Sequence, residues 1–359
     1  MAAPALADVL LRHHIALQRL SASQVAKVDK FLDQITAEIK RRLSGQDLTE
    51  LAKSRLERML KRLDSYLADT LGTYRGEVTS DLMAIANHEA DYSTKALNVS
   101  VQPDFAAPTP LQIKTAVLDS PLLVKGVDGG KLLKSFLVDW TRAERSRISG
   151  AIRLGVAMGQ TNAQIVQGIR GTAAAGYQNG IIAITKRNAD KVVHTAVQHV
   201  ASVARQAVFD ANDDVVTGVR WLATLDSRTC IQCGSLDLIE FPIDSGPRPP
   251  AHIFCRCATI PVLSADLAPL QKGGSRPSVG DDGAEPVKAS TNYFSWLTTQ
   301  PASFQDFAIG PSRGALLRNG GLSASRFAQM QLDKRFLPLS LAEAQKIEPL
   351  AFEQAGVDT

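Results

Sequence analysis

The four cysteines of the 359-residue chain all lie between positions 230 and 257. Cys230 and Cys233 form a C-x-x-C pair, and His252 precedes Cys255 and Cys257 in an H-x-x-C-x-C arrangement. Two tight turns of this kind can bring four ligands to one tetrahedral zinc ion, with sulfur at about 2.3 Å and imidazole nitrogen at about 2.0–2.1 Å. We therefore expect this segment to fold around a metal ion.

Five candidate ligands compete for four places around such an ion. The preferred set is Cys230, Cys233, His252 and Cys255, with Cys257 able to replace His252. Four protein ligands close the coordination sphere, which is typical of a structural zinc site rather than a catalytic one. The metal would then supply folding free energy to strands too short for a stable core of their own.

The cysteines also admit other interpretations. They could be small buried residues without a ligand role, or they could pair as two disulfides. A redox C-x-x-C is disfavoured because no βαβ pattern surrounds the pair. A zinc deaminase is excluded because it needs H-x-E ahead of its cysteine pair, whereas His252 follows Cys233 and lacks a Glu two residues on.

Polar residues beside the cysteines could suggest a nuclease or transferase site built from Asp226, Arg228 and Glu240. We favour a structural interpretation, because an Asp before a tight turn commonly accepts backbone N–H groups and can pair with an Arg two residues away. His194 and His199 are five residues apart, which is poor spacing for joint metal binding on a helix. These two, and the His13-His14 pair, are interpreted as ordinary helix residues.

Composition bounds the class of protein. With 45% hydrophobic residues the chain can bury a sizeable core, and its length predicts two or three domains. The net charge of +4 is mild and basic residues are mostly interspersed with acidic ones, which disfavours a dedicated duplex-DNA binder. The basic cluster Lys40-Arg41-Arg42 is interpreted as a solvated helix end that complements the helix dipole.

The sequence also predicts where the protein resides. No apolar run reaches about 18 residues, and the first 16 residues lack the apolar centre of a signal peptide. Cysteines reserved for one local site are typical of a reducing compartment rather than of a disulfide-rich secreted protein. We expect no membrane span and no export by a standard route.

The first half of the sequence is mostly helical in pattern. From Ser21 to Leu71 apolar residues follow helical spacing on either side of a break at residues 44–46, which predicts an amphipathic helical hairpin. Asp47 and Glu50 form an acidic version of the capping box at the start of the second helix. Further helices are predicted over residues 76–96, from Thr109 with Gln112, over 131–158, from Thr161 with Gln164, and over 186–211.

The pattern changes to short strands at 219–224, 238–242 and 259–262, which predicts a small α+β module. Gly and Pro residues give the segment after it the composition of a linker, and the tail carries Trp296, Phe304, Phe307 and Ile309 as docking residues. The predicted fold class is α+β. We predict a helical region at 1–145, a domain at 146–271 with its Cys/His module at 216–262, a linker at 272–289, and a tail of short helices at 290–359. In the tail, helices are predicted to start at Pro301 and Pro311, and Ser340 and Glu343 form a capping box.

Several motifs occur together in a restrictive order. Residues 224–233 read T-L-D-S-R-T-C-I-Q-C, residues 249–257 read P-P-A-H-I-F-C-R-C, and both follow G-I-R-G at 168–171 and a helical segment at 195–205. In this order the segment from Ile148 to Val262 resembles the Mu F-like minor head proteins of tailed bacteriophages, also called the phage head morphogenesis family. The tail from Trp296 to Phe327 is similar to the end of such proteins as well.

The resemblance implies a minor capsid component of the virion, present in few copies at the portal vertex and found in the host cytoplasm during assembly. Its implied partners are the portal protein or the major capsid protein, together with packaged DNA, and its implied roles are head assembly, DNA packaging or genome delivery. It implies no enzymatic activity, no small-molecule substrate and no membrane contact in the assembled head.

The sequence leaves three functions open. In the first, the helical half binds a portal or capsid partner while the cysteine module locks the fold downstream. In the second, the chain is a DNA-binding protein acting on the genome end, which predicts a steep loss of affinity with salt. In the third, the chain is a metal-dependent nuclease that uses Asp226, Arg228 or His252, a weaker hypothesis because paired carboxylates are lacking.

Overall fold

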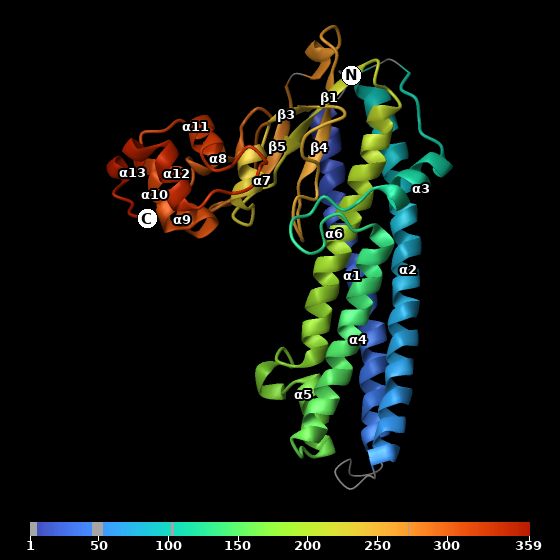
Figure 1. Cartoon of the computed structure of the whole chain (residues 1–359). Helices are drawn as coiled ribbons and strands as arrows, with labels where there is room; N and C mark the ends of the chain where they lie inside the picture. The colour runs from blue at the N-terminus through green and yellow to red at the C-terminus, as the bar shows by residue number, and fades with distance from the viewer. Residues whose placement is uncertain (1–5, 45–52, 102–103, 272) are drawn as a thin grey trace.

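A long helical bundle dominates the computed structural model, which describes residues 6–44, 53–101, 104–271 and 273–359. Helices α1 (Leu6–Leu43), α2 (Lys53–Val101), α4 (Leu133–Ala157) and α6 (Ile181–Asp210) run side by side along the bundle (Figure 1). Two small sheets lie at one end, and the C-terminal helices form a compact group beside them. The predicted α+β class is therefore confirmed.

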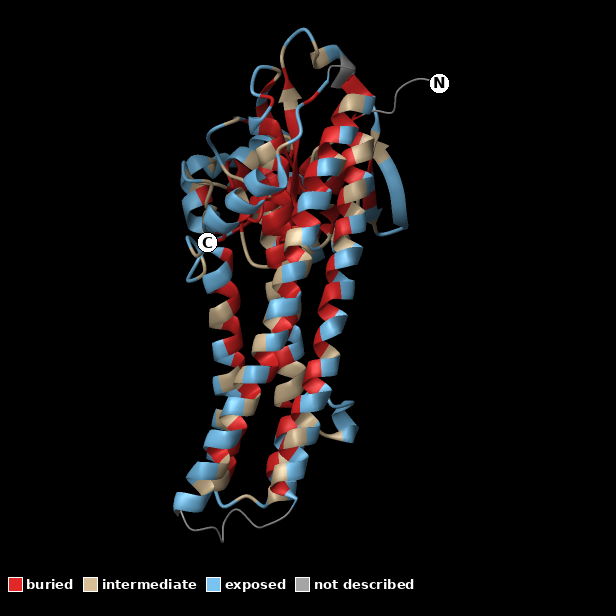
Figure 2. Cartoon of the chain, turned by 90° about the vertical axis from the view of Figure 1, so that its right-hand side faces the viewer, coloured by how far each residue is buried: buried red, intermediate tan, exposed pale blue. Residues whose placement is uncertain are grey.

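The predicted amphipathic hairpin is confirmed by α1 and α2. Val25, Val28, Leu32, Ile35 and Ile39 are all buried on one face of α1, as their spacing predicts. Figure 2 shows the same division along the bundle, with buried stripes facing inward and exposed stripes outward. Helix α1 begins well before the predicted start, and α2 continues unbroken through residues 76–96. The predicted capping box at residues 47–50 lies outside the described residues.

Two shorter helices begin where the capping signals predict. Thr109 caps α3 (Pro110–Asp119) and Thr161 caps α5 (Asn162–Arg170), and each forms a capping box with the Gln three residues on. The 3-10 turn η2 (Ala173–Ala175) then leads to α6. The predicted helices at 131–158 and 186–211 are confirmed as α4 and α6.

The predicted domain boundary after residue 145 falls inside α4 and therefore does not separate two structural units. Trp140, Ile148 and Ile152 are buried on one face of this helix, so its apolar spacing continues across the boundary. The lower part of the bundle, which we call the distal bundle, has its own core from α1, α2, α4 and α5. That core comprises Ile35, Ile39, Leu43, Leu60, Leu63, Leu67, Leu71, Ile148, Ile152, Ile165 and Ile169.

A buried charged group joins the helices near the sheets. The Glu89 carboxylate of α2 is fully buried and accepts hydrogen bonds from Arg205 of α6. It also lies 2.6 Å from the Nε2 atom of His13 on α1, and Arg205 donates to the carbonyl oxygen of Thr259. A buried carboxylate is tolerated only when it is paired in this way. The network fixes three helices and one strand against each other.

We expect the Glu89→Gln variant to be less stable than the parent at neutral pH and to lose this difference in acid. Burial raises the pKa of Glu89, but Arg205 and His13 outweigh burial and lower it to about 2. A depressed folded-state pKa contributes stability above the unfolded value, and that stability is lost as the pH falls through the folded value. Urea unfolding should show a difference of about 3 kcal/mol at pH 7 that narrows below about pH 5.

The first sheet has the order β3-β1-β4 and is antiparallel throughout. Its strands are β1 (Val216–Leu222), β3 (Glu240–Pro242) and β4 (Ala258–Leu263), which confirms the three predicted strands. Helix α7 (Ile231–Leu236) lies between β1 and β3 in the chain, and the turn η3 (Ala268–Gln271) follows β4. Val219, Trp221 and Leu263 of this sheet belong to the same hydrophobic core as the bundle helices at the end nearest the sheets.

The segment predicted as a linker at 272–289 instead contains a β-hairpin. Strands β5 (Ser275–Gly280) and β6 (Gly283–Lys288) pair antiparallel, and β5 also pairs parallel with the short β2 (Leu225–Asp226). The Gly and Pro content misled the prediction. Arg276 and Ser278 alternate with exposed residues and are buried, and Gly283 takes a φ of 106° after the turn.

The C-terminal helices enclose a second core. They are α8 (Tyr293–Leu297), α9 (Ala302–Ile309), α10 (Pro311–Asn319), α11 (Ala324–Gln329), α12 (Leu341–Ile347) and α13 (Pro349–Ala355). Trp296 and Ile309 are buried in this core as predicted, and Phe304 packs against it. Phe307 is 77% exposed, so the prediction for it is wrong. The predicted capping box of Ser340 and Glu343 starts α12.

No helix in the described part of the chain combines the length and apolar character that crossing a bilayer requires.

Candidate metal centre

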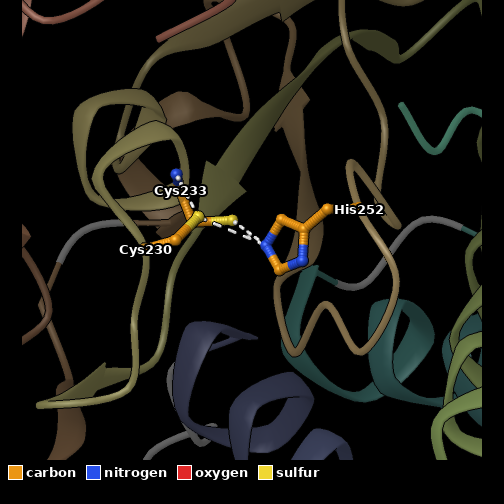
Figure 3. A group of neighbouring side chains, drawn as sticks. All are labelled: Cys230, Cys233 and His252. Carbon is orange, nitrogen blue, oxygen red and sulfur yellow. Dashed lines mark hydrogen bonds between the residues drawn. The ribbon is translucent and has the colours of Figure 1, made fainter. Parts of the chain in front are cut away.

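The two predicted ligand turns meet at the junction of sheet and bundle. Cys230 is the N-cap of α7 and Cys233 lies in its first turn. His252 and Cys255 occupy the turn before β4, and Cys257 directly precedes that strand. Figure 3 shows the side chains of Cys230 and Cys233 directed toward the imidazole of His252. The structure thus brings together residues separated by about twenty positions, as the spacing predicts.

The interatomic distances are close to those between ligands of one ion. The Nε2 atom of His252 lies 3.2 Å from Sγ of Cys230 and 3.3 Å from Sγ of Cys233. Sγ of Cys233 lies 3.9 Å from Sγ of Cys255. Tetrahedral zinc with its usual bond lengths separates neighbouring ligand atoms by about 3.6–3.8 Å. These three contacts are therefore close to the edges of a zinc tetrahedron.

A hydrogen bond fixes the orientation of the imidazole. Nδ1 of His252 lies 2.9 Å from the carbonyl oxygen of Ile253. Since a carbonyl oxygen can only accept, Nδ1 carries a hydrogen, and Nε2 is the ring nitrogen that faces the sulfur atoms. Metal-ligating histidines are commonly oriented by such a bond.

Five side chains form two overlapping groups that share Cys233. The ligand atoms of Cys230, Cys233 and His252 lie within 4.8 Å of one another, as do those of Cys233, Cys255 and Cys257. Cys233, Cys255 and Cys257 are buried and all four cysteines are free thiols. The structure therefore does not support the two-disulfide interpretation.

This donor set fits a metal ion of the zinc type. Sulfur and imidazole ligands select zinc over calcium or magnesium, which prefer oxygen. The backbone N–H of Cys233 also donates to Sγ of Cys230 at 3.4 Å, which favours a thiolate at that position. The Cys/His cluster can therefore hold a metal ion.

The pKa values show how closely the groups interact. Hydrogen bonds from Cys233 and His252 lower the pKa of Cys230 to about 5, and hydrogen bonds with Cys233 and Cys257 hold the pKa of Cys255 well below its usual range. Burial lowers the pKa of His252, but Cys230 and Cys255 outweigh it and raise this pKa to about 9. The groups share protons, and a bound cation would take the place of those protons.

Residues around the cluster hold its two turns in place. Phe254 adopts a φ of 65°, and its N–H donates to Oγ1 of Thr195 on α6 at 2.9 Å. The Arg256 guanidinium donates to Asp226 at 2.8 Å, and the Arg256 carbonyl oxygen accepts from Nε2 of His14 on α1 at 2.7 Å. The second ligand turn is thus anchored to two bundle helices and to Asp226, which precedes the first turn in the chain.

The remaining polar residues singled out in the sequence have structural partners. The carboxylate of Asp226 accepts the backbone N–H of Arg228 at 3.0 Å, as expected before a tight turn. Glu240 pairs with Arg220 across the first sheet. His194 lies 3.2 Å from Asp190, and His199 is buried on α6. Among the described residues, the only groups of three or more metal-ligating side chains are the two in the cysteine segment.

A buried ion pair that the sequence did not reveal lies beside the module. Asp237, just after α7, and Arg276 of β5 pair at 2.9 Å, and both side chains are almost fully buried. Asp237 also accepts the N–H groups of Ala223 and Tyr293. This network joins the module, the β5–β6 hairpin and the first C-terminal helix.

Helix α8 also packs closely against α7. A Cβ atom on Gly234 of α7 would lie 2.5 Å from the ring of Tyr293, so only glycine allows this approach. The hydroxyl of Tyr293 donates to the carbonyl oxygen of Asp226 at 3.1 Å. The glycine that follows the C-x-x-C pair was a sequence signal for this contact.

The fold and the site define a helical-bundle protein with a small Cys/His module at one end. Residues 146–260 match the family model described as Phage Mu protein F like protein, which confirms the resemblance and places all five candidate ligands within a Mu F-like region. The match covers about a third of the chain. No curated protein and no solved structure matches the chain.

Proposed function

We propose that the chain is a minor head protein located at the portal vertex of a tailed phage, where it acts in head assembly, DNA packaging or genome delivery without catalysing a reaction. The observation that carries this proposal is the Mu F-like match at residues 146–260. That region contains α5, α6 and the complete Cys/His cluster, so the matched part is the junction of bundle and module.

The cluster serves this role as a structural zinc centre. We assign the ligands as Cys230, Cys233, His252 and Cys255, because the first three form one close group and Cys255 contacts Cys233. Zinc would supply the cross-link between the two ligand turns. His14 and Thr195 hold the second ligand turn against the bundle, and Asp226 of β2 binds the same turn through Arg256. By linking the two turns, the metal would also fix the first turn relative to the bundle.

The ligand assignment predicts different effects for two neighbouring cysteines. Cys255→Ser should lower the bound zinc well below one ion per chain, whereas Cys257→Ser should leave it near one. The two residues are both buried and two positions apart, so each variant is the control for the other. Metal analysis of the purified proteins measures the difference. Equal zinc loss in both variants would assign Cys257 as a ligand as well and contradict the preferred set.

Assembled heads test the location. A cryo-EM map of heads containing this chain should show its bundle at the portal vertex, and purified portal protein should retain the full chain in a pull-down. The major capsid protein is the control bait. A random distribution over the shell, or retention by the capsid protein alone, would contradict the portal assignment.

A further inference from the structure

The distal bundle carries a strong concentration of positive charge. Residues 145–189 contain six basic residues and no acidic residue, and residues 40–62 contain eight basic and three acidic residues. The net charge of the whole chain is only +4, so the residues outside these two segments carry a net negative charge. The described helical residues of both segments belong to the helices that pack around the core of the distal bundle, in the lower part of Figure 1. Folding therefore gathers charges that are interspersed along much of the sequence.

More than half of these cations lack a carboxylate partner in the described part of the chain. Those that are paired are Arg41 and Arg42 with Glu38, Arg145 with Asp64, Arg147 with Glu144, and Lys186 with Asp29. Eight others are exposed and form no ion pair with the described residues, and we call this set the basic tip. It comprises Lys40, Arg55, Arg58, Lys61, Arg62, Arg153, Arg170 and Arg187. Unpaired exposed cations in one region create a positive potential that attracts a polyanion.

The arrangement of the basic tip matches the chemistry of a phosphate backbone. Arg55, Arg58 and Arg62 lie at i, i+3 and i+7 on one face of α2, which places them along about 10 Å of helix. Lys40 and Arg170, from α1 and α5, line a cavity of about 650 Å³ between those helices. Six of the eight cations are arginines, whose planar guanidinium groups bind phosphates through two hydrogen bonds.

We propose that the basic tip binds the phosphate backbone of duplex DNA without sequence preference. Lys40, interpreted from the sequence as part of a solvated helix end, would then also contact DNA phosphate groups. The proposal deepens the proposed function by naming the surface that would contact DNA, and rests on that function for the presence of DNA as a partner. Its test does not depend on the portal assignment, because DNA binding is measured on the isolated full chain. An anionic membrane surface is the competing polyanion, since Leu154 and Met158 are exposed near Arg153.

The test compares two variants that remove equal charge. The tip variant replaces Arg55, Arg58, Lys61 and Arg62 by glutamine. The control variant makes the same replacement at Lys114, Lys134, Lys288 and Lys334, which are also exposed and without ion pairs in the described chain but lie outside the distal bundle. Both variants have the same net charge. Circular dichroism checks that the helices remain folded.

Binding is measured by fluorescence anisotropy with a labelled mixed-sequence duplex of about 30 base pairs at several salt concentrations. The parent should bind with an affinity that falls steeply with salt. The tip variant should bind at least about tenfold more weakly, and its salt slope should decrease by about one for each phosphate that it no longer neutralises. The control variant should stay within about twofold of the parent.

Three results would overturn the proposal. The first is absence of parental binding at about 50 mM salt, where phosphate contacts are strong. The second is an equal reduction of affinity in the tip and control variants, which would show dependence on net charge alone. The third is binding to phosphatidylglycerol vesicles without binding to the duplex, which would assign the basic tip to a membrane surface.

Discussion

Replacement of Cys233 by serine is expected to abolish zinc binding and to unfold the module between β1 and β4. Cys233 belongs to both groups of candidate ligands, so it is the cysteine that either group requires. Structural zinc contributes on the order of 10 kcal/mol of apparent binding free energy in small domains, and most of this becomes folding free energy. The variant should contain no zinc and should lose the near-ultraviolet circular dichroism signal that Trp221 gives in β1.

The matched control is Ser235→Ala, which changes a buried side chain of the same helix without removing a ligand. It should keep one zinc ion per chain and melt close to the parent. A Cys233→Ser protein that melts like the parent would contradict a structural role for the metal.

The Asp237→Ala variant should lose about 3–5 kcal/mol of unfolding free energy, because it leaves the Arg276 guanidinium buried without its partner. Burial raises the pKa of Asp237 above its usual value although Arg276 and two backbone N–H groups oppose this. Burial of these charges is therefore unfavourable in itself, and removal of one member leaves the other without compensation. Denaturant unfolding monitored at the C-terminal helices measures the loss.

Glu240→Ala is the control for this measurement. Glu240 pairs with Arg220 on the first sheet, but its side chain is 49% exposed. An exposed pair of this kind contributes about 0–1 kcal/mol. Equal destabilisation by the two substitutions would contradict a special contribution of the buried Asp237–Arg276 pair to stability.

Local signals in the sequence predicted much of the fold. Helix starts at Thr109, Thr161 and Ser340 follow from side chains that cap N–H groups within one turn. The meeting of the C-x-x-C and H-x-x-C turns follows from the geometry that a shared metal ion requires. Each of these features depends on residues close in sequence or on one chemical constraint.

Features that depend on distant partners could not be predicted in this way. Arg276 lies in a stretch rich in Gly and Pro, and it is buried because the carboxylate of Asp237 and the carbonyl oxygens of Ala223 and Thr291 accept its hydrogen bonds. His14 reaches the ligand turn from 242 residues away. The basic tip likewise arises because α1, α2, α4, α5 and the start of α6 pack around one core, which composition along the chain does not show.

Metal analysis of the purified chain tests the structural zinc centre most directly. We expect one zinc ion per chain, released only when a mercurial reagent titrates the thiols, with loss of the module's fold as the zinc is released. A protein with far less than one zinc per chain, in which alkylating reagents label all four cysteines without unfolding it, would contradict a metal-stabilised module.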